Sequence, residues 1–144
     1  MIKTVALRLA DNFAPKSGTI AEHQKIIDSN GYVWYGKMGS ALSGSIIEEI
    51  LKLEEPKFLL INSGKFDRYW MYVEDIKKEC TEPQFIPEYY RNQTERFKCW
   101  FKITKIELAQ KDVMAHCFVT SSGNSLSEAS KHSMSPYFKI EYRD

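Results

Sequence analysis

The sequence predicts an α+β fold, in which helices flank a curved sheet of mixed or antiparallel strands. Short apolar segments of the kind found in strands recur along the chain, and two helical segments separate the first three of them. After the second helix the pattern is mostly β, which differs from the regular alternation of an α/β protein. The 144 residues suffice for one hydrophobic core, and we expect a single domain over residues 1–144.

The expected strands follow from a two-residue hydrophobic period or from short continuous apolar runs. The clearest is Phe97 to Leu108, where apolar side chains alternate with polar ones. Segments of the same kind predict further strands at residues 3–10, 32–36, 57–62, 68–76, 113–119 and 137–142. Ser63-Gly64-Lys65 separates two of these strands and predicts a hairpin.

Three helices are expected, at residues 20–29, 46–53 and 125–133. The first has Thr19 as its predicted N-cap, with Glu22 completing a capping box. Ser45 is the predicted N-cap of the second helix, whose apolar side chains share one face. Residues 79–96 are rich in proline and polar side chains, and we interpret them as a long loop.

Composition predicts a cytoplasmic protein without membrane contact. No apolar run approaches the roughly 20 residues that cross a bilayer, and the first residues lack the features of a signal peptide. The three cysteines form no close pair, which fits a reducing compartment. The net charge is +1, but residues 91–144 carry nine Lys/Arg against six Asp/Glu, and this half could face phosphates.

Motifs for catalysis, metals or cofactors are absent. The glycines do not have the spacing of a phosphate loop or a nucleophile elbow, and His23, His116 and His132 lack paired ligands at zinc-site spacing. We expect a binding protein without cofactor, metal or catalytic residues. A small enzyme that uses Cys or His remains an alternative, because such residues meet in space rather than in sequence. A protein-interaction module of a phage-defence system is another.

Aromatic side chains in loop-like segments are the candidate binding residues. Trp34 lies near the end of a strand that leads into a glycine- and serine-rich loop, and Tyr89 and Tyr90 lie in the segment before the clearest strand. Two rings can hold a flat base between them, each contact contributing about 1–3 kcal/mol. The polar turn Ser121 to Asn124 would then bind the base edge. The alternative is that the rings only fill the core.

The order of these segments resembles the PUA-like superfamily and, within it, the YTH and EVE domains, which read modified bases. The likeness rests on Trp34 in a strand, the helix at 46–53, the apolar strand at 57–62 with its hairpin partner, and the strand from Phe97. It implies a curved mixed sheet or a partly open barrel flanked by helices. It also implies an aromatic cage for a methylated base that is single-stranded or flipped out of a duplex.

The resemblance also implies which residues form the site. One wall of the cage is Trp34, and the other is Tyr89 or Tyr90. The contacts to the base edge or the backbone come from Asn124, Ser122, Lys37 and Ser40.

The chain departs from YTH domains at two points. The first strand lacks a Lys-x-Ser start, with Arg8 as its nearest basic residue, and the second wall is tyrosine rather than tryptophan. These departures place it nearer the prokaryotic domains that are fused to McrB-type restriction motors. The implied partners are DNA or RNA with a modified base, and a fused or separate nuclease or motor subunit.

Overall fold

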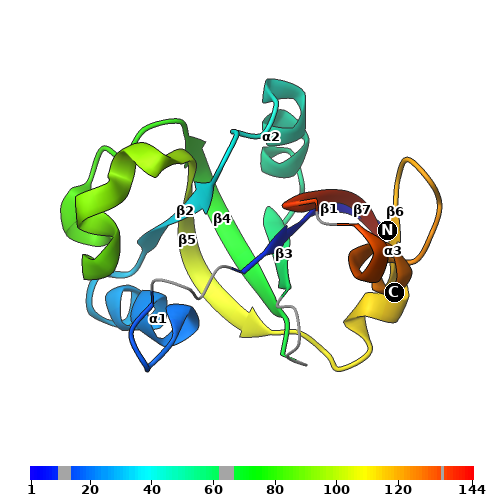
Figure 1. Ribbon diagram of the computed structural model, residues 1–144, viewed down its shortest axis with the longest axis horizontal. Helices are drawn as coiled ribbons and strands as arrows, with labels where there is room; N and C mark the ends of the chain where they lie inside the picture. The colour runs from blue at the N-terminus through cyan, green and yellow to red at the C-terminus, as the bar shows by residue number, and fades with distance from the viewer. Residues whose placement is uncertain (10–13, 62–66, 134) are drawn as a thin grey trace.

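The computed structural model describes residues 1–9, 14–61, 67–133 and 135–144. These residues form a sheet of seven strands in the order β2-β5-β4-β3-β1-β7-β6. The sheet is open, with β2 and β6 at its edges, and helices flank it (Figure 1). This arrangement confirms the predicted α+β class with a mixed sheet and flanking helices.

The strands are β1 (Ile2–Arg8), β2 (Val33–Met38), β3 (Lys57–Ile61), β4 (Tyr69–Lys77), β5 (Phe97–Leu108), β6 (Cys117–Val119) and β7 (Tyr137–Tyr142). Neighbouring strands are antiparallel except for β1 and β3, which are parallel. The predicted turn Ser63-Gly64-Lys65 lies outside the described residues, but β3 and β4 are antiparallel neighbours, as a hairpin requires. Ile2 pairs with Tyr142, which places the two chain ends at one side of the molecule (Figure 1).

The helices are α1 (Thr19–Asn30), α2 (Gly44–Leu51) and α3 (Leu126–His132), with 3₁₀ segments η1 (Pro83–Phe85), η2 (Glu88–Arg96) and η3 (Val113–His116). In the described part of the chain, no helix is long and apolar enough to cross a membrane. The predicted ends of the three α-helices lie within two residues of the observed ends. Gly31 ends α1 in the left-handed conformation, with φ 96°.

Both predicted helix caps are wrong by one or two residues. Thr19 lies inside α1, and Gly18 occupies the N-cap position without a side-chain hydrogen bond. The carboxylate of Glu22 instead accepts hydrogen bonds from the side chains of Ser17 and Lys25. Helix α2 is capped by Ser43 rather than Ser45, because the extended backbone of Ser43 lets its Oγ accept from the Ile46 amide at 3.4 Å.

Two segments differ from their predicted structure. Residues 79–96 are not only loop, since they contain η1 and η2. Short 3₁₀ turns form here because Ile86 and Tyr90 point into a hydrophobic cluster while polar neighbours stay exposed. The strand predicted at 113–119 begins only at Cys117, after the 3₁₀ turn η3.

Hydrophobic side chains pack on both faces of the sheet. On one face α1 and α2 cover a core that includes Tyr35, Phe58 and Phe101. On the other face, α3 and η3 cover the half of the sheet that contains β1, β7 and β6. The segment η1–η2 covers β2 and β5 on that same face, at the left of Figure 1.

Gly36 in β2 allows the aromatic side chains under η1–η2 to lie directly on the sheet. A Cβ at this position would lie 2.8 Å from Cγ of Phe97 and 3.0 Å from Cζ3 of Trp100. Such distances require both rings to move, and both are almost fully buried. The absence of a side chain at Gly36 is therefore a packing requirement.

We expect Gly36→Ala to lower the free energy of unfolding by about 1–3 kcal/mol, because the added methyl overpacks a buried site. The matched control is Gly44→Ala in the first turn of α2, where a Cβ meets nothing within 4 Å. There the substitution should be neutral or slightly stabilising. Urea denaturation of the two variants measures the difference, and equal stabilities would contradict the packing requirement.

Candidate functional site

The structure brings Trp34, Tyr89 and Tyr90 together in an aromatic cluster beneath η1–η2. The cluster also contains Ile86, Phe97 and Trp100. The Tyr89 and Tyr90 ring centroids are 4.7 Å apart, and Trp34 and Tyr90 are only 2% and 5% exposed. In this arrangement neither Trp34 nor Tyr90 offers an open ring face to a base.

Glu82 fixes the position of Trp34. Its carboxylate accepts hydrogen bonds from Nε1 of Trp34 at 2.9 Å and from the hydroxyl of Tyr32 at 2.6 Å. The bonds from Tyr32 and then Trp34 lower the pKa of Glu82, so the carboxylate stays charged at neutral pH. A base would reach Trp34 only after η1–η2 moved away.

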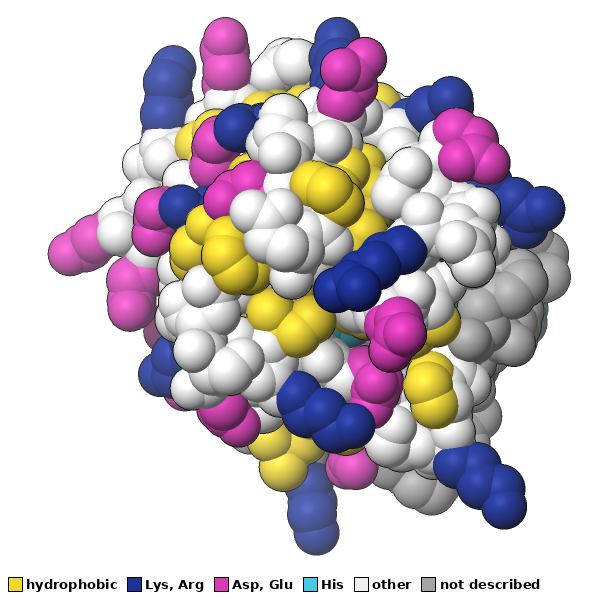
Figure 2. Space-filling view, turned by 90° about the vertical axis from the view of Figure 1, so that its left-hand side faces the viewer, with side chains coloured by type: hydrophobic (Ala, Val, Ile, Leu, Met, Phe, Trp, Pro, Cys, Tyr) yellow, Lys and Arg dark blue, Asp and Glu magenta, His cyan; other side chains and the backbone are white. Residues whose placement is uncertain are grey.

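The surface on this side of the molecule carries charges of both signs. Figure 2 shows basic and acidic side chains interspersed over this face, with hydrophobic side chains between them. A mixed pattern of this kind gives no strong field of one sign, and a phosphate backbone gains little from it.

Lys37 is a buried charged side chain on the other face of β2. It is 5% exposed, and its Nζ donates hydrogen bonds to the backbone oxygens of Met38 at 3.2 Å and Ser40 at 2.7 Å. Burial lowers the pKa of Lys37. No carboxylate among the described residues pairs with this ammonium. A buried cation without a counter-ion favours an anionic or carbonyl oxygen nearby.

Tyr137 connects Lys37 to a groove on the far side of the sheet. Nζ of Lys37 lies 5.4 Å from the centroid of its ring. Tyr137 packs against the core under α1 and α2, and it is also one of the residues that line a groove of about 540 Å³, together with Thr120, Ser121, Asn124, His132, Ser135 and Lys139. This volume lies within the range of small-molecule sites, roughly 300–1,000 Å³.

The predicted site residues therefore fall into three groups. Trp34, Tyr89 and Tyr90 form the first, and Lys37 with the Ser40 carbonyl forms the second. The third is the turn after β6. There Asn124 lines the groove, and its backbone N–H donates a hydrogen bond to Oγ of Ser122 at 3.2 Å. This turn lies near β6, at the opposite edge of the sheet from β2.

The sequence reasoning missed Tyr137, which lies between the second and third groups. It treated this residue only as the start of the last strand. A signal was present, since a serine-rich stretch over 127–135 leads directly to Tyr137 and Lys139. Binding residues often lie in surface loops, and this polar stretch precedes the last strand as such a loop would.

The cysteines do not have the character of catalytic thiolates. Burial raises the pKa of Cys80 and Cys99, and it raises that of Cys117 to about 12. Nucleophilic cysteines require the opposite shift. Within the described ranges, no three His, Cys, Asp or Glu side chains group as a metal site.

His23 lies behind the aromatic cluster and is fully buried. Its ring is 5.2 Å from that of Tyr35 and 5.4 Å from that of Tyr90, and its Nδ1 is 2.8 Å from the backbone oxygen of Thr19. Its Nε2 has no hydrogen-bond partner among the described residues. Burial lowers the pKa of His23 to about 4. The ring is therefore neutral near pH 7.

Comparison with models of known families gives a match over most of the chain. The model of a family described as Pua-like matches residues 5–139, which run from β1 into β7. No curated protein and no solved structure matches the chain.

We expect His23 to make stability depend on pH. Its folded pKa is about 4 against an ordinary value of 6.5, so between these values the unfolded chain binds a proton that the folded chain does not. Stability should fall by about 2 kcal/mol from pH 7 to pH 5. Urea denaturation at both pH values should show a smaller drop for His23→Phe. The exposed His132→Phe control should keep the drop, and an unchanged drop in His23→Phe would refute the assignment.

The thiols should alkylate slowly at neutral pH. Burial holds the pKa of each cysteine above its ordinary value, which leaves little thiolate for iodoacetamide to attack. Cys80 is the most exposed and should react first, while the other two should react only after unfolding. Mass spectrometry of intact protein counts the added groups over time. A cysteine in the native protein that reacts faster than free cysteine would reopen the alternative of a thiol enzyme.

Proposed function

The chain belongs to the Pua-like family, and on this premise we propose that it binds nucleic acid and recognises a modified, methylated base. The base is single-stranded or flipped out of a duplex, because an edge inside a duplex is not free to enter a groove. The proposal describes a binding module rather than an enzyme, and the raised pKa values of the three thiols support that choice.

The observation that carries the proposal is the buried ammonium of Lys37 beside the ring of Tyr137. Burial lowers the pKa of Lys37, and its Nζ donates to the backbone oxygens of Met38 and Ser40, with no carboxylate partner in the described residues. A ligand that supplies a phosphate or carbonyl oxygen would compensate this charge. The adjoining aromatic ring provides the apolar surface that a base requires.

In the proposed complex the base enters the groove and packs against Tyr137. The side-chain amide of Asn124 lies in the same groove and can both donate to and accept from a base edge. Lys139 and His132 line the same groove and are exposed, and they would meet phosphates there by leaving Glu49 and Glu128, which lie 3.9 Å and 3.5 Å from them. A buried methyl group would favour the modified base by roughly 0.8 kcal/mol, or about fourfold in affinity.

In a second possible arrangement, the base is bound between Trp34 and either Tyr90 or Tyr89. This arrangement requires η1–η2 to move, because Trp34 is bonded to Glu82 and covered by Ile86. The two arrangements differ in the variants that disrupt them. Loss of binding in Tyr137→Ala favours the groove, whereas loss in Trp34→Phe with an intact groove favours the aromatic cluster.

A reader of this kind corresponds to the YTH and EVE domains in function. We place it in a modification-dependent restriction system of the McrB type, where it would target modified foreign DNA. A fused or separate nuclease or motor subunit would then supply cleavage. The support for this setting is the resemblance of the chain's segment order to those domains.

The proposed function predicts that Tyr137→Ala weakens binding of a short methylated single-stranded DNA by about five- to 150-fold, the loss of one stacked ring. Lys37→Met should weaken binding as well, while stability changes by less than about 1 kcal/mol because a desolvated charge is removed along with two hydrogen bonds. Fluorescence anisotropy measures the affinities, and urea denaturation measures the stabilities.

The control for Tyr137→Ala is Tyr72→Ala, which removes a partly buried tyrosine of β4 that lies away from the groove. It should leave affinity unchanged. Equal affinities for methylated and unmodified DNA would contradict base recognition. Equal affinities for the wild type, Tyr137→Ala, Lys37→Met and Trp34→Phe would contradict both arrangements of the site.

A further inference from the structure

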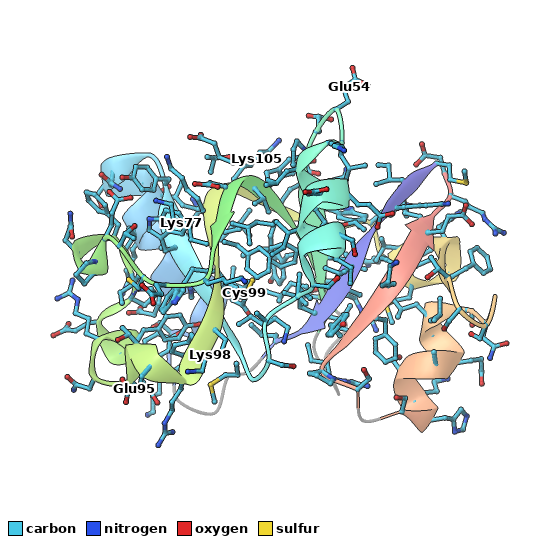
Figure 3. All side chains as sticks on the ribbon, turned by 90° about the horizontal axis from the view of Figure 1, so that it is seen from above. Glu54, Lys77, Glu95, Lys98, Cys99 and Lys105 are labelled. Carbon is cyan, nitrogen blue, oxygen red and sulfur yellow. The ribbon has the colours of Figure 1, made fainter. Side chains whose placement is uncertain are left out.

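A second groove lies beside the aromatic cluster, at the start of β5. Its volume is about 550 Å³, and its lining includes Ala41, Phe97 and Trp100. Figure 3 shows Glu95 and Lys98 on the chain that leads from η2 into β5, and both line the groove. Neither the family match nor the resemblance assigns a role to it.

Trp100 presents a polar atom without a partner. Its side chain is fully buried, and no described residue accepts a hydrogen bond from its Nε1. A buried N–H without an acceptor is destabilising, typically by about the free energy of one hydrogen bond. Trp100 lines the groove but its Nε1 is covered, so a ligand there would supply the acceptor once the side chains over the indole move.

The orientation of the indole places Nε1 on the side of the groove. The six-membered ring faces β2, since its Cζ3 lies 3.0 Å from the position of a Cβ on Gly36. The indole is rigid, so the edge that carries Nε1 faces away from β2, toward β4. The residues that follow β4, Lys78 to Cys80, form that side of the groove.

The charges around the groove indicate a neutral ligand with polar edges. Lys78 and Lys98 are balanced by Glu79 and Glu95 in the lining. A phosphate would meet two carboxylates there, whereas the edge of a base offers acceptors to the lysines and the indole and donors to the glutamates. The aromatic wall of Phe97 and Trp100 favours a flat ring over an aliphatic chain.

The groove adjoins the segment that follows Lys37. Ala41 in its lining follows Ser40 directly, and the carbonyl of Ser40 accepts a hydrogen bond from Lys37. We propose that this groove binds the base of a neighbouring nucleotide by its edge, with a ring carbonyl or nitrogen accepting a hydrogen bond from Nε1 of Trp100. This inference rests on the proposed function, because it takes the ligand to be the same strand.

The test is the indole ¹⁵N–¹H spectrum of the full chain, which contains three tryptophans. Addition of a short single-stranded DNA should move the Trp100 signal downfield, as expected when its N–H gains an acceptor. The Trp34 signal is the internal control, since its Nε1 is already bonded to Glu82. Trp100→Phe identifies the signal and should weaken DNA binding about two- to tenfold, the range for one hydrogen bond. Trp70→Phe, in the core on the other half of the sheet, should not.

The outcomes separate this inference from the proposed function. If DNA binds but the Trp100 signal does not move and Trp100→Phe keeps the wild-type affinity, the proposal that the second groove binds a base is refuted. The proposed function then stands. If DNA does not bind at all, both are refuted. N-methylacetamide is the control for a peptide ligand. An equal shift with this amide and with a free nucleoside, at the same concentration, would refute the preference for a base.

Discussion

The two-residue period of β5 is the constraint on which the rest of the structure depends. Cys99, Phe101 and Ile103 point into the core under α1 and α2, while Trp100 between them points to the opposite face, into the cluster under η1–η2. A shift of the register by one residue would exchange the two sets. The strand also pairs with both β2 and β4. These three strands therefore form one layer that separates the core under α1 and α2 from the cluster under η1–η2.

Much of this fold could be predicted from the sequence because its signals are local. Alternation in β5, the apolar run of β3 and the Asn30-Gly31 helix end each depend on a few neighbouring residues. The order of the strands depends on contacts between distant segments, such as the parallel pairing of β1 with β3. The polar composition of residues 79–96 predicts a loop. The 3₁₀ turns of this segment are stabilised by Ile86 and Tyr90, whose burial depends on tertiary packing.

The sequence offers candidate site residues by type, but it does not show how the fold groups them. Aromatic rings suggest stacking wherever they occur, yet Trp34 and Tyr90 are covered by η1–η2. The strand period already separates Trp34 from Lys37, since positions an odd number of residues apart on a strand face opposite sides. Tyr137 was missed because its contact with Lys37 joins the last strand to an edge strand 100 positions earlier. A contact between residues so far apart in the sequence cannot be predicted from a local sequence pattern.

The aromatic cluster and Lys37 thus lie on opposite faces of the same short strand, and both carry polar atoms that packing alone does not explain. Nε1 of Trp100 and Nε2 of His23 have no partner among the described residues, and each belongs to a ring packed against Tyr90. Hydrocarbon side chains of similar size would stabilise the same region without leaving donors or acceptors unpaired. An ammonium, an indole N–H and an imidazole nitrogen kept around one strand are more consistent with ligand binding than with stability. For that reason β2 and its two faces, rather than the aromatic rings alone, define where a base is to be sought.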